Sequence, residues 1–291
     1  MKILVTGADG QLGSEMKWAV LRNFRLEGEV RFTDVELLDI TKKLALGRFI
    51  KEYRPDVVMN FAAYTAVDKA EKEQKKAFAI NSAAVEHLAE LSTKYPFFLL
   101  HISTDYVFDG KSQSPISEDH PMAPESYYGV SKASGEEQMR RICHHGAIIR
   151  TSWLYTYVGH NFLKTILKHA KEKPELKVVN DQTGTPTYAA DLAQFILKNL
   201  KKMLKVKSVE TYHFSNSGEA TWYDFASAIV ELAQIPCRVL PISTDEYPTA
   251  APRPAYSVLS TQKIEEKFKC TPRHWKEALK DSMTHLKSLN L

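Results

Sequence analysis

The stretch KILVTGADGQLG, residues 2–13, joins an apolar run to three glycines spaced three positions apart. The apolar run at 2–6 predicts a buried strand, and a helical pattern follows the glycines. In this G-x-x-G-x-x-G arrangement, Gly7 allows a tight turn, Gly10 lets the backbone approach a pyrophosphate, and Gly13 permits close packing of the helix on the strand. The N-terminus of such a helix offers free N–H groups to an anion. The stretch therefore predicts a nucleotide site, with an ordinary strand-to-helix turn as the alternative.

Short apolar runs alternate with helical patterns through the first half of the chain, which predicts βαβ units and a buried parallel sheet. The strand candidates are 2–6, 56–63, 97–104 and 147–152, with a weaker one at 30–34. Beyond residue 152 the candidates are helices at 161–170, from 188, at 222–234 and at 274–287, and strands at 176–180, 211–216 and 238–243.

These elements predict an α/β fold, a Rossmann-type doubly wound parallel sheet with a smaller, discontinuous C-terminal substrate domain. We assign residues 1–152 and 176–215 to the NAD(P)-binding Rossmann domain. Residues 153–175 and 216–291 then form the substrate-binding domain. A chain of 291 residues is long enough to bury a substantial core in this arrangement.

Composition narrows the class of protein. The 39 Lys and Arg residues against 35 Asp and Glu give a net charge of +4, too mild to indicate nucleic acid as a partner. The three cysteines fall in no metal-ligand spacing and are too few for a disulfide framework. No apolar run approaches the ~20 residues that span a bilayer. We therefore expect a cytoplasmic monomer or homodimer with no membrane partner.

The segment YYGVSK, residues 127–132, places Tyr128 and Lys132 four positions apart, on one face of a helix. An unperturbed tyrosine has a pKa of ~10, and a neighbouring ammonium lowers it toward the range of acid–base chemistry. Thr104 ends the strand candidate at 97–104, and the carboxyl ends of parallel strands form the ligand crevice. We expect Thr104 to hydrogen-bond a substrate carbonyl beside Tyr128. The alternative for the Tyr–Lys pair is an ordinary surface turn.

The acid expected to bind the adenine ribose has two candidates. Asp34 lies 21 residues beyond Gly13, where a ribose-binding acid is typical, and Asp39 offers a later position. Arg31 and Lys42 are cations that suit a 2′-phosphate. The choice between NADPH and NADH therefore stays open.

Segments that are typical of one protein family lie along almost the whole chain. The segments are 5–13, 54–71, 80–90 with its Asn81-Ser82 pair, 103–110, 127–136, 148–155, 160–167, 178–193 and 253–259. Together they resemble the extended short-chain dehydrogenase/reductase family, and within it the dTDP-4-dehydrorhamnose reductases. The resemblance implies reduction of the C4 keto group of dTDP-6-deoxy-L-lyxo-4-hexulose by NADPH or NADH, giving dTDP-L-rhamnose. It also implies that a 3,5-epimerase supplies this nucleotide-sugar substrate.

The resemblance implies roles for individual residues. Tyr128 would protonate the C4 oxygen, Lys132 would tune it and hold the nicotinamide ribose, and Thr104 would orient the ketone. The implied cofactor-binding residues are Gly7, Gly10, Gln11, Leu12, Gly13, Asp39, Ile40, Ala62, Ala63, Tyr64, Thr65, Ser103, Tyr128 and Lys132. The implied substrate-binding residues are Val67, Thr104, Asp105, Tyr106, Tyr128, Trp153, Asn161 and Arg253. Core packing is the alternative for Tyr106 and Trp153, and a surface salt bridge is the alternative for Arg253.

Some positions depart from the family pattern. His160 stands where an asparagine is more typical. Some members are thought to bridge dimers through a glutamate-bound Mg²⁺; Glu15 is present, but Ala189 and Ala190 supply no second acid. We therefore predict no metal site.

Three other functions are possible for a protein of this fold. A 4,6-dehydratase needs an acid and a base beside the threonine, and Tyr106 occupies the second of those positions after Asp105. A 4-epimerase is chemically possible with Thr104, Tyr128 and Lys132 alone. A non-catalytic regulatory subunit, like that of methionine adenosyltransferase, is the alternative from another class, and the intact catalytic trio argues against it.

Overall fold

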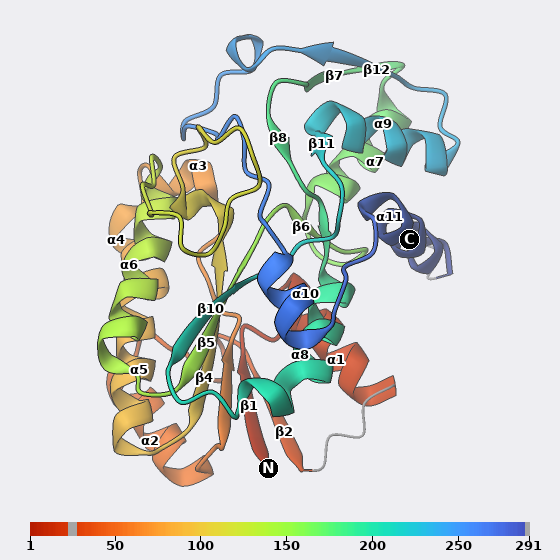
Figure 1. Cartoon of the computed structure of the whole chain (residues 1–291). Coiled ribbons are helices and arrows are strands. Elements are labelled where there is room, and N and C mark those ends of the chain that lie inside the picture. Colours follow the sequence, from red (N-terminus) through yellow and green to blue (C-terminus); the bar gives the residue numbers. More distant parts are fainter. Residues whose placement is uncertain (23–27, 289–291) are drawn as a thin grey trace.

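The computed structural model describes residues 1–22 and 28–288. A six-stranded sheet, in which every neighbouring pair of strands is parallel, forms the larger part of the protein (Figure 1). In spatial order its strands are β10 (Val209–His213), β5 (Gly146–Thr151), β4 (Phe98–Thr104), β3 (Val57–Asn60), β1 (Lys2–Thr6) and β2 (Glu29–Thr33). The strands β3 and β5 are buried along their whole length, which explains why they read as unbroken apolar runs.

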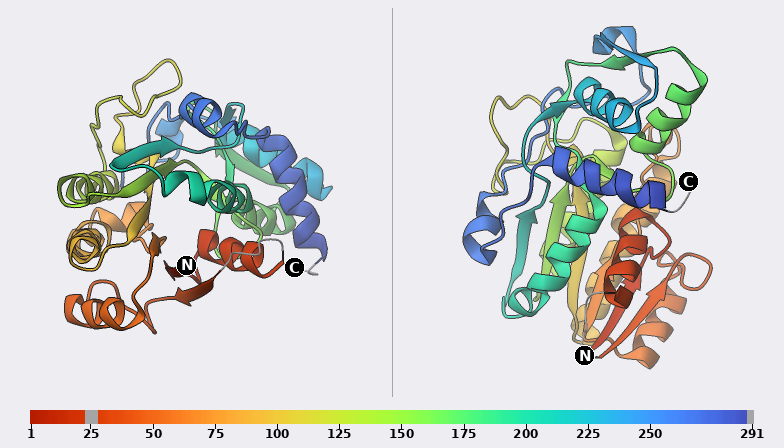
Figure 2. Two further views of the ribbon diagram at one scale, coloured as in Figure 1. Left: turned by 60° about the horizontal axis from the view of Figure 1, so that its bottom comes forward. Right: turned by 90° about the vertical axis from the view of Figure 1, so that its right-hand side faces the viewer.

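Helices cover both faces of this sheet (Figures 1 and 2). One face carries α1 (Gln11–Arg22), α8 (Ala189–Met203) and α10 (Gln262–Phe268), and they share one apolar core with the sheet. The other face carries α2 (Lys43–Tyr53), α5 (Ala84–Lys94) and α6 (Tyr127–Ile142), with a second core. This is the doubly wound architecture that the alternation of strands and helices predicts.

The order of the strands reverses at β1, which lies between β2 and β3. In open parallel sheets, a crevice for ligands forms at the carboxyl end of such a reversal. Gly7 follows β1 with a φ of +67°, in the left-handed region. A Cβ on Gly7 would lie 2.4 Å from the backbone nitrogen of Ala62, so the loops after β1 and β3 touch at this point.

A smaller region lies beyond the carboxyl ends of the strands (Figure 1, top). It has its own apolar core, built mainly from α7 (Phe162–Glu172), α9 (Trp222–Ala233) and α11 (Trp275–Ser288). Three two-stranded sheets accompany these helices. They pair β7 (Glu175–Val179) with β12 (Arg238–Ile242), β8 (Thr183–Gly184) with β11 (Ala220–Thr221), and β6 (Leu154–Tyr155) with β9 (Thr187–Tyr188).

Some elements differ from the sequence-based expectation. The strand expected at 56–63 stops at Asn60, because residues 61–66 leave the sheet toward the glycine loop. The strand expected at 176–180 pairs with β12 and does not enter the large sheet, although we placed residues 176–215 with the Rossmann domain. The short helices α3 (Val67–Ala70) and α4 (Gln74–Phe78), and also α10, carried no clear signal. No helix in the described part of the chain is long and apolar enough to cross a membrane.

Candidate active site

The glycine loop between β1 and α1 is shaped for close approach by a ligand. A Cβ on Gly13 would lie 2.4 Å from the carbonyl oxygen of Gly7, so the first turn of α1 packs directly on the loop. The buried Oε1 of Gln11, the first residue of α1, has no hydrogen-bond partner among the described residues. The backbone N–H groups at the N-terminus of α1 suit a phosphate-bearing ligand, and the Gln11 oxygen suits a donor such as a hydroxyl group. The loop therefore fits the dinucleotide that its sequence predicts.

The side chains of the two candidate acids for the ribose both accept hydrogen bonds from the backbone. Asp34 accepts hydrogen bonds from the backbone nitrogens of Asp9 (2.8 Å) and Val35 (2.7 Å). Asp39 accepts from the backbone nitrogen (2.9 Å) and hydroxyl (2.6 Å) of Thr41. Asp34 is thus tied to the glycine loop itself, because Asp9 lies between Gly7 and Gly10.

Arg31, a candidate partner for a 2′-phosphate, is engaged elsewhere. Its guanidinium pairs with Glu29 at 3.1 Å and lies 4.3 Å from the centre of the Tyr53 ring. The side chains of two further cofactor candidates, Leu12 and Ile40, are buried in the cores on the two faces of the sheet. For these two residues only the backbone is available to a ligand.

Asn81 joins the loop after β3 to the helix that carries the catalytic candidates. It lies in a π-helical turn at Ala79–Ala83, a distortion that often marks functional sites. Its Oδ1 accepts from the backbone nitrogen of Tyr64 at 2.8 Å, and its Nδ2 donates to the Tyr64 carbonyl at 3.0 Å and to Ser131 Oγ at 3.0 Å. The sequence motifs include the pair Asn81 and Ser82. The contacts show that Asn81 links the segment at Tyr64 to helix α6 at Ser131, and we call this set of hydrogen bonds the clamp.

Tyr128 and Thr104 come together at the carboxyl edge of the sheet. Tyr128 is 8% exposed in the first turn of α6, which Ser126 caps by accepting from the Gly129 backbone nitrogen at 3.1 Å. A Cβ on Gly129 would lie 2.2 Å from the Tyr106 carbonyl oxygen, so this turn rests on the segment after β4. Thr104 Oγ1 donates to Asp105 Oδ1 at 2.9 Å.

The apolar surroundings include further substrate candidates. Val67 and Tyr106 pack in one cluster with Tyr64 and Tyr128, and the rings of Tyr106 and Tyr128 meet edge to face at 5.5 Å. Burial raises the pKa of Tyr128 to about 12, with the Thr104 hydroxyl opposing and the Asp105 carboxylate adding to the rise. Burial also raises the pKa of Asp105 to about 6. The Tyr128 hydroxyl therefore keeps its proton at neutral pH.

Burial raises the pKa of Tyr128, whereas we expected Lys132 to lower it. The Nζ of Lys132 is turned toward β4, where it donates to the Ile102 carbonyl at 2.6 Å and lies 3.3 Å from His101 Nε2. Burial lowers the pKa of Lys132 to about 8, with Glu136 opposing. The physical reason is burial, because desolvation disfavours both the phenolate and the ammonium.

Trp153 forms part of an aromatic stack, in an unusual backbone conformation. Its φ is +46°, in the left-handed region that bulky residues rarely occupy. Its indole lies parallel to that of Trp222, with ring centres 3.5 Å apart, and a Cβ on Gly184 would lie 2.5 Å from it. The indole is half-buried, held between a ring and a glycine.

The side chains of two implied substrate-binding residues, Arg253 and Asn161, already form hydrogen bonds within the chain. Arg253 Nη2 pairs with Asp68 Oδ2 at 2.7 Å, the salt bridge that we gave as the alternative. Asn161 caps α7: it accepts from the Lys164 backbone nitrogen at 3.1 Å and donates to the carbonyls of Thr156 and Val158. The amide of Asn161 thus holds the turn before α7.

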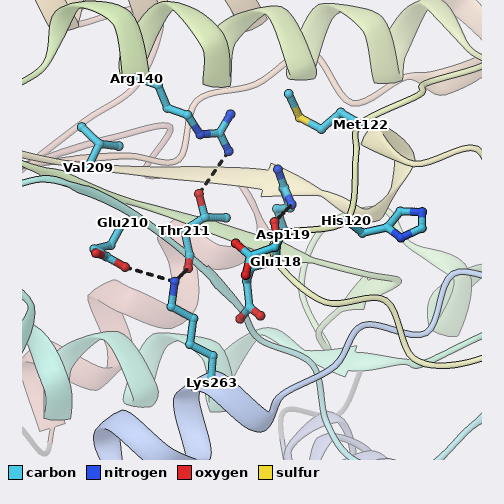
Figure 3. A pocket seen from close by; sticks show the side chains of 10 residues that line it. Glu118, Asp119, His120, Met122, Arg140, Val209, Glu210, Thr211 and Lys263 are labelled. Carbon is cyan, nitrogen blue, oxygen red and sulfur yellow. Dashed lines mark hydrogen bonds and ion pairs between the residues drawn. The ribbon is translucent and has the colours of Figure 1, made fainter.

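A cavity of about 360 Å³ lies away from this edge, beside β10 (Figure 3). Its cations are already paired: Arg150 with Glu136 at 2.8 Å, Arg140 with Glu136 at 2.6 Å, and Lys263 with Glu210 at 3.0 Å. Burial alone would raise the pKa of Glu136, but the Arg150 guanidinium holds that pKa below its usual range. The cavity is therefore lined by a structural ion-pair network.

Glu15, the acid considered for a metal, is buried and accepts a hydrogen bond from the Thr156 hydroxyl. Burial raises the pKa of its carboxyl. Within residues 1–22 and 28–288, no group of three or more His, Cys, Asp or Glu side chains is arranged to hold a metal ion.

The fold and the site define an NAD(P)-binding oxidoreductase of the short-chain dehydrogenase/reductase type. The family model of the RmlD substrate binding domain matches residues 1–288. The spore coat polysaccharide biosynthesis protein SpsK of Bacillus subtilis is 44% identical over 281 residues, 96% of each chain. The chain belongs to the RmlD family of nucleotide-sugar reductases.

Solved structures agree with this assignment. A dTDP-4-dehydrorhamnose reductase from Clostridium acetobutylicum is 42% identical with a TM-score of 0.93, and the match covers 99% of this chain and 100% of that one. The dTDP-4-dehydrorhamnose reductase of Bacillus anthracis, solved in complex with NADP, is 37% identical with a TM-score of 0.91, covering 98% and 99%.

Proposed function

We propose that this protein reduces the C4 keto group of dTDP-6-deoxy-L-lyxo-4-hexulose with NADPH or NADH, giving dTDP-L-rhamnose. The observation that carries the proposal is the buried Tyr128 hydroxyl beside Thr104, at the strand ends that adjoin the glycine loop. A reduction needs a proton donor for the oxygen that gains charge as hydride arrives. A phenol with a pKa of about 12 is protonated at neutral pH and can supply that proton.

The glycine loop and the clamp at Asn81 are the parts that fit the cofactor. Gly7, Gly10 and Gly13 let a pyrophosphate approach the start of α1, where the backbone N–H groups suit its negative charge. A reduced nicotinamide bound there supplies hydride. Asn81 fixes Tyr64 and α6 relative to each other, so the wall of the cofactor site and the proton donor keep one spacing.

Three features support a nucleotide sugar as the substrate. Thr104 presents a hydroxyl beside Tyr128, which suits a keto oxygen. Val67, Tyr106 and the Trp153 indole offer apolar surfaces of the kind that sugar rings contact. Arg253 suits a diphosphate, which would compete with Asp68 for its guanidinium. We propose that a 3,5-epimerase supplies this substrate.

The test is one coupled assay. The purified protein is mixed with a dTDP-4-keto-6-deoxy sugar, a 3,5-epimerase and NADPH or NADH, and absorbance at the nicotinamide band is followed. We expect loss of the reduced cofactor in proportion to dTDP-L-rhamnose formed, and the ratio of rates with the two cofactors gives the preference. A sugar that the 3,5-epimerase alone does not form, made without net consumption of cofactor, would indicate the 4-epimerase alternative. No consumption of cofactor and no sugar beyond the product of the 3,5-epimerase would refute the proposal.

A further inference from the structure

A line of four buried polar side chains runs through the protein beneath the catalytic lysine. Thr6 Oγ1 lies 2.7 Å from Asn60 Oδ1, Asn60 Nδ2 lies 3.1 Å from His101 Nδ1, and His101 Nε2 lies 3.3 Å from Lys132 Nζ. None of the four is more than 2% exposed. They come from β1, β3, β4 and α6, so the line crosses the sheet from the glycine loop to the catalytic helix.

The imidazole of His101 can carry only one proton on its two ring nitrogens. Burial, and then the charge of Lys132, lower the pKa of His101 well below its usual value, so the imidazole is neutral and carries one N–H. If Asn60 Nδ2 donates to Nδ1, the proton sits on Nε2 and points at Lys132. An N–H facing an ammonium is repelled, whereas one facing an uncharged amine forms a hydrogen bond.

Turning the Asn60 amide over gives the second arrangement. Oδ1 then accepts from an Nδ1–H, Nε2 carries no proton, and Nε2 can accept a hydrogen bond from the ammonium of Lys132. Histidine holds one proton in both arrangements, while Lys132 holds one more in the second than in the first. The ammonium therefore requires the Nδ1–H tautomer, and the Nε2–H tautomer favours the amine.

Other groups near Lys132 do not replace this contact. Glu136, one turn along α6, is the carboxylate whose charge favours the ammonium, and it is held by Arg150 and Arg140. Tyr128, on the same helix, is neutral, and from β4 the remaining contact is the Ile102 carbonyl. Among the side chains that hydrogen-bond to Lys132 in the described residues, His101 is the one that can change between donor and acceptor.

We propose that His101 is a positioning residue, which matches its tautomer to the charge of Lys132, with the Asn60 amide turning to follow. The proposal rests on the proposed function, in which Lys132 acts beside Tyr128. Its consequence is that Lys132 keeps His101 as a hydrogen-bond partner in a fully buried place, with or without the extra proton. His101 thereby sets the pH range in which the reductase works.

The first experiment needs no catalysis. In protein with ¹⁵N-labelled histidine, the two ring nitrogens of His101 are followed by NMR as pH rises through the Lys132 pKa, and His101→Gln identifies the signals. We expect the Nδ1–H tautomer below that pKa and the Nε2–H tautomer above it. A single tautomer at every pH, or an imidazolium, would overturn the proposal even if the protein reduces a different sugar.

The second experiment compares His101→Leu with His101→Gln in the pH profile of kcat, each with its thermal unfolding. Leu removes the acceptor of the ammonium, so the descending basic limb should move to lower pH by about one to two units. The amide of Gln can accept or donate, and its limb should stay within about half a unit of wild type. His87→Gln on α5 is the matched control and should leave the profile unchanged.

Two outcomes would count against the inference. A lower kcat at every pH with an unmoved limb, in a folded His101→Leu variant, would show a merely structural role for His101. A limb that moves equally in the Leu and Gln variants would show that exchange between donor and acceptor is not what matters. An inactive wild type would refute the proposed function but leave the NMR result standing.

Discussion

The carboxyl edge of the sheet and the cavity beside β10 are both rich in polar residues, but they are built in opposite ways. Around the cavity the basic side chains are paired: Arg150 and Arg140 with Glu136, and Lys263 with Glu210. At the carboxyl edge, burial moves the pKa of Tyr128, Lys132 and Asp105, and within residues 1–22 and 28–288 none of the three forms an ion pair.

The contrast separates a cluster of ion pairs from a cluster of unpaired buried groups, and we predict that the second is the functional one. A buried charge that is paired is held in one state, as the lowered pKa of Glu136 shows. A buried group without a counter-charge favours its neutral form, so Tyr128 keeps its proton and the pKa values of Asp105 and Lys132 move toward neutral pH.

The largest effect that we expect is on turnover at the carboxyl edge. Tyr128→Phe removes the proton donor and keeps the ring that packs against Tyr106, so kcat should fall by ~10²–10⁴. Cofactor affinity, measured by fluorescence titration, should stay within about twofold of wild type, because that loss is confined to proton transfer. Tyr127→Phe, on the exposed neighbour, is the control and should keep full activity. Unchanged turnover in Tyr128→Phe would remove the proposed donor.

The next effect is on stability at the cavity. Arg150→Met leaves the fully buried Glu136 with Arg140 as its remaining cation, and should cost about 3–5 kcal/mol of unfolding free energy. The matched change Arg140→Met, at a side chain 34% exposed, should cost about 1 kcal/mol. Urea denaturation gives both values. Equal losses in the two variants would contradict the view that burial makes the Arg150 pair different.

Asp105 links pH to stability at the carboxyl edge. Its pKa rises from 3.8 to about 6 on folding, so the folded state binds the proton more tightly, and wild type loses stability as pH rises through about 6. Asp105→Asn does not titrate and should escape this loss. Its stability relative to wild type should therefore increase by about 2 kcal/mol between about pH 4 and pH 7. A difference that does not vary with pH would show that Asp105 ionises normally.

The smallest effect belongs to the rim of the cavity. Lys263 pairs with Glu210 at 3.0 Å, and both side chains are about one-third exposed, so water screens the pair. Lys263→Ala should change the unfolding free energy by about 1 kcal/mol or less and leave kcat as in wild type. A loss of turnover in this variant would mean that the cavity takes part in the reaction.

Much of the fold and the centre of the site could be predicted from sequence. Gly7, Thr104 and Tyr128 stand at the ends of strongly periodic segments, and the ends of parallel strands meet at one edge. Asp68 could not be predicted as the partner of Arg253, because the two residues are 185 positions apart and Arg253 lies outside the helices and strands. His101 lies in the apolar run FFLLHIST, residues 97–104. The only sign of its role in the sequence is that a polar residue stands within a predicted buried strand.

The direction of Lys132 shows a different limit. The i, i+4 spacing places Lys132 on the face of Tyr128, but a long side chain reaches several neighbours from one backbone position. Burial decides between them, and here Nζ meets the carbonyl of Ile102. Asn161 is a similar case, because the cap of α7 depends on the turn that precedes the helix.

The position of β10 has a consequence for synthesis of the chain. The strand at Val209–His213 closes the sheet next to β5, which ends at Thr151, so a nascent chain that stops before Val209 has the outer edge of β5 uncovered. The free N–H and C=O groups of such an edge pair readily with another polypeptide. A chain that ends before residue 209 should therefore aggregate more readily than the whole protein, because β5, which is buried along its whole length, becomes the edge strand.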